Sequence, residues 1–364
     1  MAEKKRRFAV LTGGGDCPGL NAVIRAVIKT FLQNDCEVFG IYNGFNGLIN
    51  GNLKLMNFAD VSGILPRGGT ILGTTNRDNP FKFAVEENGE LVYYDMRDKV
   101  VENLEKHDIE ALVVIGGDGS LNIGAKLARE CGIKVVGVPK TIDNDLPCTE
   151  RTFGFDTAVA CATEAVDRLH TTAESHHRVM ALEVMGRYAG WIALYSGIAG
   201  GADVILLPEI PYNIDSVIEK IEQRRKDGKN FSIVVVAEGA KPVGGELSVA
   251  RVVKGSFEPI RLGGAGERLV REIEERTGIE SRCTVLGYLQ RGGSPSSYDR
   301  ILSTRYGVAA AEACLRGEFN VMVSLENDQI VTVYIQKAAS SPRLVPTDSE
   351  IIRTGRQIGI CFGD

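Results

Sequence analysis

Two aspartates lie close together in the stretch VPKTIDND at positions 138–145, directly after an apolar run. Asp143 and Asp145 are two residues apart, so both can face the same way. Neighbouring carboxylates suit phosphoryl transfer, in which one accepts the proton of the attacking hydroxyl and the other lies near Mg²⁺. A turn rich in Asp and Asn that caps the next helix would contain the same residue types. The stretch is therefore a candidate catalytic loop with a structural alternative.

Two glycine-rich segments follow strand-like runs, TGGGD at 12–16 and GGDGS at 116–120. Glycines between a strand and a helix allow backbone N–H groups to converge on an anion near the positive end of the helix. The carboxylate of Asp118 in such a loop suits Mg²⁺ beside a polyphosphate. The first segment lacks the G-x-x-x-x-G-K-[ST] pattern of a Walker loop. Each could be a plain turn, but two of them favour phosphate binding.

Four arginines stand at strand ends or in glycine-rich turns: Arg178, Arg187, Arg282 and Arg291. Guanidinium groups match phosphate oxygens, so the set predicts a phosphate site, although one such arginine alone is normally a surface charge. Glu238 ends the run FSIVVVAEG and could accept hydrogen bonds from sugar hydroxyls. The pair His176–His177 has no third ligand and is interpreted as structural.

These residues need a scaffold of alternating strands and helices, and the hydrophobic pattern predicts one. Strands are expected at 8–11, 37–42, 111–115, 134–138, 179–184, 204–207, 231–237 and 283–286. Helices are expected after residue 20 and at 156–173, 188–199, 214–227, 265–277 and 299–316. Residues 76–99 form an excursion, with a hairpin expected around Asn88–Gly89. This alternation indicates an α/β fold with largely parallel sheets, in which ligands bind at the carboxyl ends of strands.

Composition limits the class of protein. The 364 residues are 44% hydrophobic and 24% charged, which is typical of a globular chain. The net charge of −5 shows no excess of basic residues, which binding to nucleic acid or an anionic membrane would favour. The eight cysteines are scattered without metal-ligand spacing, which favours reduced thiols. We expect a cytoplasmic protein with no nucleic-acid or membrane partner.

The ordered set of motifs resembles the 6-phosphofructokinase family, which includes bacterial ATP enzymes and pyrophosphate-using relatives. The motifs are GGGDCPGLN at 13–21, GGDGS at 116–120, PKTIDND at 139–145, MGR at 185–187, EG at 238–239 and LGYLQRGGSPSSYDR at 286–300. The resemblance covers residues 7 to about 330. It implies two interlocked three-layer α/β/α domains with largely parallel sheets. Residues 1–154 and about 290–340 would bind the phosphoryl donor, and about 155–289 and 341–364 the sugar phosphate.

The resemblance also implies roles for single residues. Asp143 would be the general base toward the C1 hydroxyl of fructose 6-phosphate, supported by Thr141 and Asp145. Asp118 and Asp145 would serve Mg²⁺. The donor site would be lined by Gly15, Arg77, Gly117, Asp118, Gly119 and Ser120. The sugar phosphate would be held by Met185, Gly186, Arg187, Glu238, Tyr288 and Arg291.

In the family, arginines matching Arg178 and Arg282 reach the sugar phosphate from a neighbouring subunit. The active form would therefore be a homodimer or homotetramer with shared sites. At the family's effector pocket Arg25 matches, whereas Lys29 and His170 replace arginines, so strong control by nucleotides or phosphoenolpyruvate is not expected. Tyr288 stands where many members have histidine, and a phenol can still donate to phosphate.

The donor is predicted from positions 119 and 140. Pyrophosphate enzymes of the family resemble one another in having Asp and Lys there, and typical ATP enzymes have Gly at both. This chain combines Gly119 with Lys140. Aspartate at 119 would repel the α-phosphate of ATP, whereas Lys140 attracts either donor. We therefore expect ATP, with pyrophosphate as the alternative. A NAD or lipid kinase and a non-catalytic sugar-phosphate sensor on the same fold are more distant hypotheses.

Overall fold

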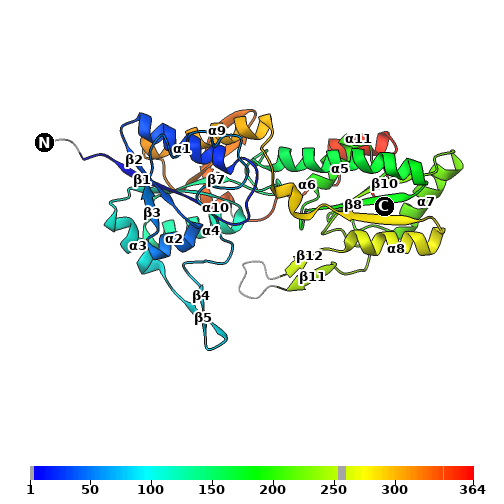
Figure 1. Cartoon of the computed structure of the whole chain (residues 1–364), viewed down its shortest axis with the longest axis horizontal. Coiled ribbons are helices and arrows are strands. Elements are labelled where there is room, and N and C mark those ends of the chain that lie inside the picture. Colours follow the sequence, from blue (N-terminus) through cyan, green and yellow to red (C-terminus); the bar gives the residue numbers. More distant parts are fainter. Residues whose placement is uncertain (1–3, 253–259, 339) are drawn as a thin grey trace.

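Seven strands form the larger of two main sheets in this computed structural model, which describes residues 4–252, 260–338 and 340–364. Their order is β15-β14-β7-β6-β1-β2-β3. The strands are β1 (Arg7–Thr12), β2 (Glu37–Ile41), β3 (Leu53–Leu55), β6 (Ala111–Gly116), β7 (Val135–Pro139), β14 (Val321–Glu326) and β15 (Gln329–Tyr334). The central pairs are parallel, and β3 and β15 add antiparallel edges. We call this sheet and its helices the large half (Figure 1).

Helices cover both faces of the large sheet. On one face lie α1 (Leu20–Gln33) and α9 (Ser297–Arg316), and on the other α2 (Gly44–Asn50), α3 (Arg97–Lys106), α4 (Asp118–Cys131) and α10 (Ile335–Ala338). The alternation along β1 explains this. Phe8 and Val10 belong to the core cluster that includes α1, and Ala9 and Leu11 to the one that includes α4. Successive side chains of a strand point to opposite faces of the sheet, so a continuous apolar run is buried on both faces.

The small half contains a parallel sheet of order β13-β8-β10-β9. Its strands are β8 (Val179–Val184), β9 (Val204–Leu206), β10 (Ser232–Ala237) and β13 (Ser281–Val285). One face is covered by α5 (Phe155–His176) and α6 (Trp191–Ala199), and the other by α7 (Ile214–Lys226) and α8 (Ala265–Thr277). The last helix, α11 (Glu350–Gln357), and a single-turn 3₁₀ helix, η1 (Gly287–Arg291), complete the described helices of this half.

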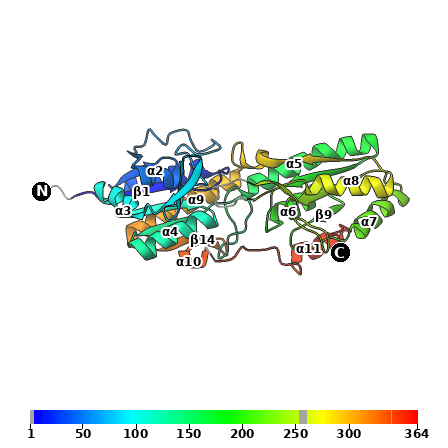
Figure 2. The ribbon, with the colours of Figure 1, turned by 90° about the horizontal axis from the view of Figure 1, so that it is seen from below.

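The chain passes between the halves after β7, after β13 and after α10 (Figure 2). One core cluster accordingly contains Val10 and Val138 of the large half together with Leu182 and Val235 of the small half. Shared burial of apolar surface holds the two halves together without a separate linker. The halves are therefore interlocked three-layer units, which confirms the predicted fold class; the domain boundaries remain a prediction.

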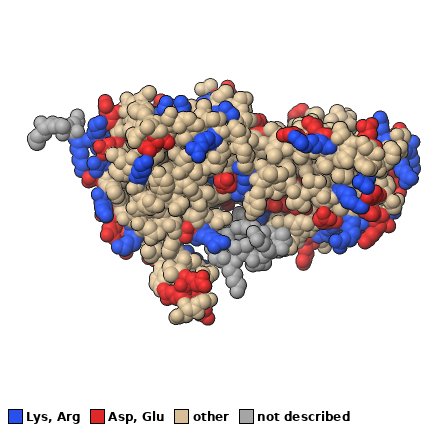
Figure 3. All heavy atoms as spheres, viewed as in Figure 1, with Lys and Arg blue, Asp and Glu red and all other residues tan. Residues whose placement is uncertain are grey.

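Two hairpins project beside the halves: β4 (Phe83–Glu87) with β5 (Glu90–Tyr94), and β11 (Val249–Val252) with β12 (Ile260–Leu262). The first confirms the hairpin expected at Asn88–Gly89, where both residues have positive φ, as a two-residue turn requires. Figure 3 shows acidic side chains at its tip, where Glu86, Glu87 and Glu90 are exposed. Elsewhere on that face charges of both signs intermingle.

All eight cysteines are free thiols, as expected. Among the described residues, no helix is long and apolar enough to cross a membrane.

Candidate active site

A cavity of about 1060 Å³ lies where the carboxyl ends of the two sheets meet. Its walls come from the segments that follow β1, β6 and β7 of the large half and β8, β10 and β13 of the small half. Backbone turns that follow parallel strands place their side chains at one edge, where α/β proteins bind ligands. The volume is at the upper end for small-molecule sites and leaves room for two substrates.

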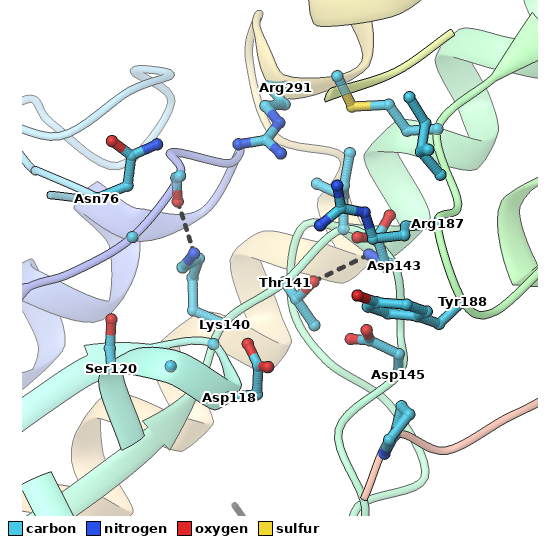
Figure 4. A pocket seen from close by; sticks show the side chains of 18 of the residues that line it. Asn76, Asp118, Ser120, Lys140, Thr141, Asp143, Asp145, Arg187, Tyr188 and Arg291 are labelled. Carbon is cyan, nitrogen blue, oxygen red and sulfur yellow. Dashed lines mark hydrogen bonds between the residues drawn. The ribbon is translucent and has the colours of Figure 1, made fainter. Parts of the chain in front are cut away.

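The stretch that follows β7 carries both aspartates into this cavity. Asn144 between them has a left-handed backbone (φ 52°) and is buried, and its Oδ1 accepts the Thr152 N–H at 2.9 Å. The Asp143 N–H donates to Thr141 Oγ1 at 3.1 Å (Figure 4). These bonds fix a turn rather than leave a mobile loop. Asp143 and Asp145 are thus presented on a rigid support, as a catalytic carboxylate requires.

Lys140, at the start of that stretch, points away from the aspartates toward the first glycine-rich segment. Its side chain is 5% exposed, and Nζ donates to the Gly15 carbonyl at 2.5 Å (Figure 4). Burial lowers the pKa of Lys140, and the nearby Arg291 guanidinium lowers this pKa further. A lysine held in this way adds positive charge to the donor side of the cavity.

Two backbone N–H groups of the first glycine-rich segment donate hydrogen bonds to carbonyls of neighbouring segments. The Gly13 N–H donates to Ile115 O at 2.9 Å and the Gly14 N–H to Thr75 O at 3.0 Å. These two N–H groups are therefore not available to an anion, in contrast to the hypothesis of a converging phosphate loop. The Arg291 guanidinium packs directly against Gly15, because a Cβ there would lie 1.8 Å from Arg291 Nη1. Gly15 itself lines the cavity.

The second glycine-rich segment opens helix α4, whose first residue is Asp118. Gly117, Asp118, Gly119 and Ser120 all line the cavity. A Cβ built on Gly119 would meet no atom within 4 Å, so this position faces open space. The positive end of a helix favours phosphate, and an absent side chain at 119 leaves room for it.

The small half contributes Arg187, Tyr188 and Glu238 to the wall of the cavity. Arg187 and Tyr188 follow β8, and the Arg187 guanidinium lies 5.5 Å from the centre of the Tyr188 ring. Glu238 follows β10, and burial together with the charges of Asp143 and Glu183 raises its pKa to about 7. Arg187 and Arg291 oppose this rise in pKa. Acidic and basic groups of both halves therefore act on one another across the cavity.

The structure brings together most of the predicted site residues. The cavity is lined by Gly15, Gly117, Asp118, Gly119, Ser120, Lys140, Thr141, Asp143, Asp145, Met185, Arg187, Glu238, Tyr288 and Arg291. Gly186 lies between two lining residues, with φ 135° and no room for a Cβ against the Ala189 carbonyl. Arg77 is exposed and does not line the cavity; its neighbour Asn76 does.

Arg178 and Arg282 lie outside this cavity. Arg178 immediately precedes β8 and forms an ion pair with Glu280 at 2.8 Å. Arg282 pairs with Glu280 at 2.6 Å and with Glu274 at 3.2 Å. Both stand near the amino ends of their strands, whereas the cavity lies at the carboxyl ends.

Sequence reasoning missed several lining residues: Asp16, Asn76, Asn79, Glu183, Tyr188 and the segment Ser340–Pro342. Tyr188 directly follows the MGR motif, so its position was a usable signal. Glu183 lies within β8 and is buried, where its carboxylate accepts the Gly264 and Gly266 N–H groups at the start of α8. The Ser340–Pro342 segment carries no local pattern that indicates a site.

A Mg²⁺ ion with a polyphosphate is compatible with these residues. Mg²⁺ is usually bound by one or two carboxylates, several waters and substrate phosphates. Asp118 and Asp145 supply carboxylates to the cavity. No cluster of three or more potential metal ligands occurs in residues 4–252, 260–338 and 340–364, so the described residues contain no all-protein metal cage.

Comparison with known proteins identifies the family. A family model described as phosphofructokinase matches residues 7–314. The chain belongs to the phosphofructokinase family. The ATP-dependent 6-phosphofructokinase 2 of Clostridium perfringens is 53% identical to it over 100% of both chains. The pyrophosphate–fructose 6-phosphate 1-phosphotransferase of Amycolatopsis mediterranei is 51% identical over 94% of this chain and 97% of that protein.

A solved phosphofructokinase also matches the fold. The T-state crystal structure of phosphofructokinase from Pichia pastoris superposes with a TM-score of 0.79 at 33% identity. It covers 93% of this chain, which spans only 36% of the Pichia chain. The two-halved architecture described above is thus a phosphofructokinase fold.

Proposed function

We propose that this phosphofructokinase transfers the terminal phosphoryl group of ATP to the C1 hydroxyl of fructose 6-phosphate, giving fructose 1,6-bisphosphate and ADP, the glycolytic reaction. The single observation that carries this proposal is the cavity itself. Asp143 lines it together with Arg187 of the small half and the glycine-rich segments of the large half. The curated relative from Clostridium, which matches over the whole chain, is an ATP-dependent 6-phosphofructokinase.

In the proposed mechanism, Asp143 accepts the proton of the C1 hydroxyl as its oxygen attacks the terminal phosphorus. Arg187 stabilises the negative charge of the transferring group. Arg291 and Tyr288 bind the sugar phosphate, and Glu238 accepts hydroxyl hydrogen bonds. Asp118 and Asp145 would hold Mg²⁺, which neutralises phosphate charge when bound. ADP leaves with the electron pair of the broken P–O bond.

ATP is favoured over pyrophosphate because position 119 is glycine facing open space. Lys140 adds positive charge, which attracts either donor. Pyrophosphate remains the second candidate, since the relative from Amycolatopsis is a pyrophosphate enzyme with 51% identity. We further propose a cytoplasmic homo-oligomer in which Arg178 and Arg282 serve a neighbouring subunit.

The deciding experiment gives purified protein fructose 6-phosphate and Mg²⁺, with ATP and pyrophosphate compared as donors. We expect turnover with ATP. Turnover with pyrophosphate alone would refute the donor assignment. Absence of turnover with either donor would refute the assignment as an enzyme and favour a sugar-phosphate sensor, which equilibrium binding of fructose 6-phosphate would detect.

A further inference from the structure

The chain crosses back from the large half to the small half at its C-terminal end. After α10, residues 340–349, here called the C-terminal strap, run to α11 along the lower edge of the molecule (Figure 2). Ser340, Ser341 and Pro342 line the cavity, and Arg343 follows them. The strap therefore touches the active site before it reaches the small half.

Arg343 joins the two sides of the catalytic loop (residues 140–150) through three hydrogen bonds, which together are called the clasp. Its backbone N–H donates to Asp145 O at 2.6 Å. Its guanidinium Nη1 donates to the carbonyls of Asn144 at 3.3 Å and Glu150 at 3.0 Å, six residues apart. These contacts join the two sides of the loop that presents Asp143 and Asp145 to the cavity.

The other side of Arg343 is fixed to the small half. Its guanidinium lies over the Trp191 ring, 4.4 Å from the ring centre, and its carbonyl accepts the Trp191 Nε1–H at 2.9 Å. Trp191 is 5% exposed and opens α6, directly after the segment that carries Arg187. A planar guanidinium can stack and donate at the same time, which a lysine ammonium cannot.

A second bond holds the strap two residues further on. The Val345 N–H donates to Glu209 Oε1 at 2.8 Å, and the same carboxylate accepts the Gly190 N–H at 3.0 Å. Gly190 and Trp191 are thus tied to the strap at adjacent points. The strap consequently connects the segment after β8, which carries Arg187, to the loop that carries Asp143.

We propose that Arg343 is a positioning residue that holds Asp143 and Arg187 in the mutual geometry phosphoryl transfer needs. It touches neither substrate and acts through the catalytic loop and Trp191. The proposal rests on the proposed function for its kinetic consequence. A displacement of about 1 Å between reacting groups can cost roughly 100-fold in rate, so the effect should fall on kcat.

The test compares Arg343→Met and Arg343→Lys with Arg353→Met, an exposed arginine on α11 as the matched control. We expect Arg343→Met to lower kcat roughly 10- to 100-fold, with KM for fructose 6-phosphate changed by less than about threefold. Arg343→Lys should recover part of kcat, because it keeps the charge over Trp191, and Arg353→Met should leave kcat unchanged.

Two measurements need no turnover. Hydrogen exchange of peptides covering residues 141–152 should be faster in Arg343→Met, because the Asp143 and Thr152 N–H groups lose the clasp that supports their bonds. Trp191, the single tryptophan of the chain, should change its fluorescence emission. If the wild type turns over neither donor, the proposed function fails. The hydrogen-exchange comparison then still tests whether Arg343 stabilises the catalytic loop.

Unchanged kcat and unchanged exchange in Arg343→Met would overturn the proposal. An equal loss of kcat in Arg353→Met would overturn it as well, because the effect would then belong to α11 in general. If Arg343→Met yields no folded protein, Trp191→Phe decides. That variant keeps a smaller aromatic ring but loses the N–H bond to the Arg343 carbonyl and part of the stacking surface, so we expect kcat lowered about three- to tenfold with faster exchange in 141–152. Wild-type behaviour of Trp191→Phe would then refute the clasp.

Discussion

Gly119 is the residue at which a small change should redirect the choice of donor. A Cβ there would meet no protein atom within 4 Å and the position lines the cavity beside Asp118, so we expect the fold to accept a short side chain whose charge enters the cavity. We predict that Gly119→Asp raises KM for ATP at least about tenfold through like-charge repulsion with the phosphates. Steady-state kinetics with ATP, together with a thermal melt that stays near the wild-type value, would check this.

Gly119→Asn is the matched control, because it adds nearly the same volume without the charge. We expect Asn to impair ATP use much less than Asp. Equal damage by both variants would assign discrimination at this position to size. ATP kinetics unaffected by either variant would remove position 119 from the donor site.

Glu238 should make stability depend on pH. Its pKa is raised from 4.5 to about 7 in the folded chain, chiefly by burial. The folded state therefore binds the proton more tightly than the unfolded state, and this group's stabilisation is complete below about pH 4.5 and is lost as the pH rises toward 7. We predict that Glu238→Gln, which cannot ionise, loses less stability than the wild type over that window.

The measurement for Glu238 is the difference in unfolding free energy between wild type and Glu238→Gln at pH 5 and pH 8. The wild type should lose on the order of 2–3 kcal/mol more than the variant between the two pH values. Other titrating groups, such as Asp299, are common to both proteins and cancel in the difference. A difference that stays constant with pH would contradict the raised pKa of Glu238.

At the scale of elements, Asp299 joins two helices. It lies in the first turn of α9 and is fully buried, and its carboxylate accepts the Gly154 N–H at 2.9 Å and the Thr157 N–H at 2.8 Å at the start of α5. Removal of the carboxylate leaves these buried donors unsatisfied. We predict that Asp299→Ala lowers the free energy of unfolding by about 2–4 kcal/mol, measured by chemical denaturation.

Asp328→Ala provides the comparison for Asp299, since the Asp328 side chain is 87% exposed in its pair with Arg305. We expect a loss below about 1 kcal/mol there. A similarly small loss in Asp299→Ala would show that the α5–α9 junction does not depend on the carboxylate.

The elements with an unbroken apolar run could be predicted from the sequence. The buried strands β6, β8 and β10 each stand within two residues of the expected bounds. The antiparallel pair β14–β15 was missed: β15 is partly exposed, and the apolar run of the buried strand β14 is interrupted by Ser324, although Asn327 and Asp328 at the turn both have positive φ. Lys140 bonds to Gly15 and Arg343 bonds to Glu150, and in each case the two residues are more than 100 positions apart. No local sequence pattern encodes such contacts.

On the scale of the whole molecule, Arg178 and Arg282 lie outside the cavity of their own chain and form ion pairs with Glu280, which favours our proposal that they act in a neighbouring subunit. Arg282 pairs with Met180 in register, and the cavity begins three residues further along β8, at Glu183. Three strand residues span roughly 10 Å, and the Arg282 guanidinium is engaged by Glu274 and Glu280 instead of the cavity. These positions agree with the shared sites that the resemblance implies, and the shared sites remain a prediction.

A mixture of two defective variants should therefore recover activity. We predict that co-expressed Asp143→Ser and Arg282→Ser regain roughly a quarter of wild-type activity, because half of randomly paired dimers are mixed and each has one intact site. Co-expressed Asp143→Ser and Arg187→Ser should recover nothing, since both residues line the cavity of their own chain. Failure of the first pair to recover activity while mixed dimers form would assign Arg282 to its own chain.

Neither half of the protein is contiguous in sequence, and this constrains how it folds as it is synthesised. The large sheet is completed only by β14 and β15, and in the small sheet the Ile205 N–H donates to the carbonyl of Cys361, three residues before position 364. Phe362 is itself buried in the shared core. Because domains normally fold as units during synthesis, both halves here must wait until β14, β15 and the segment around Phe362 have left the ribosome. The growing chain therefore exposes apolar surface until the segment around Phe362 has been made, and a truncation that removes this segment should yield an aggregating protein rather than a partly active one.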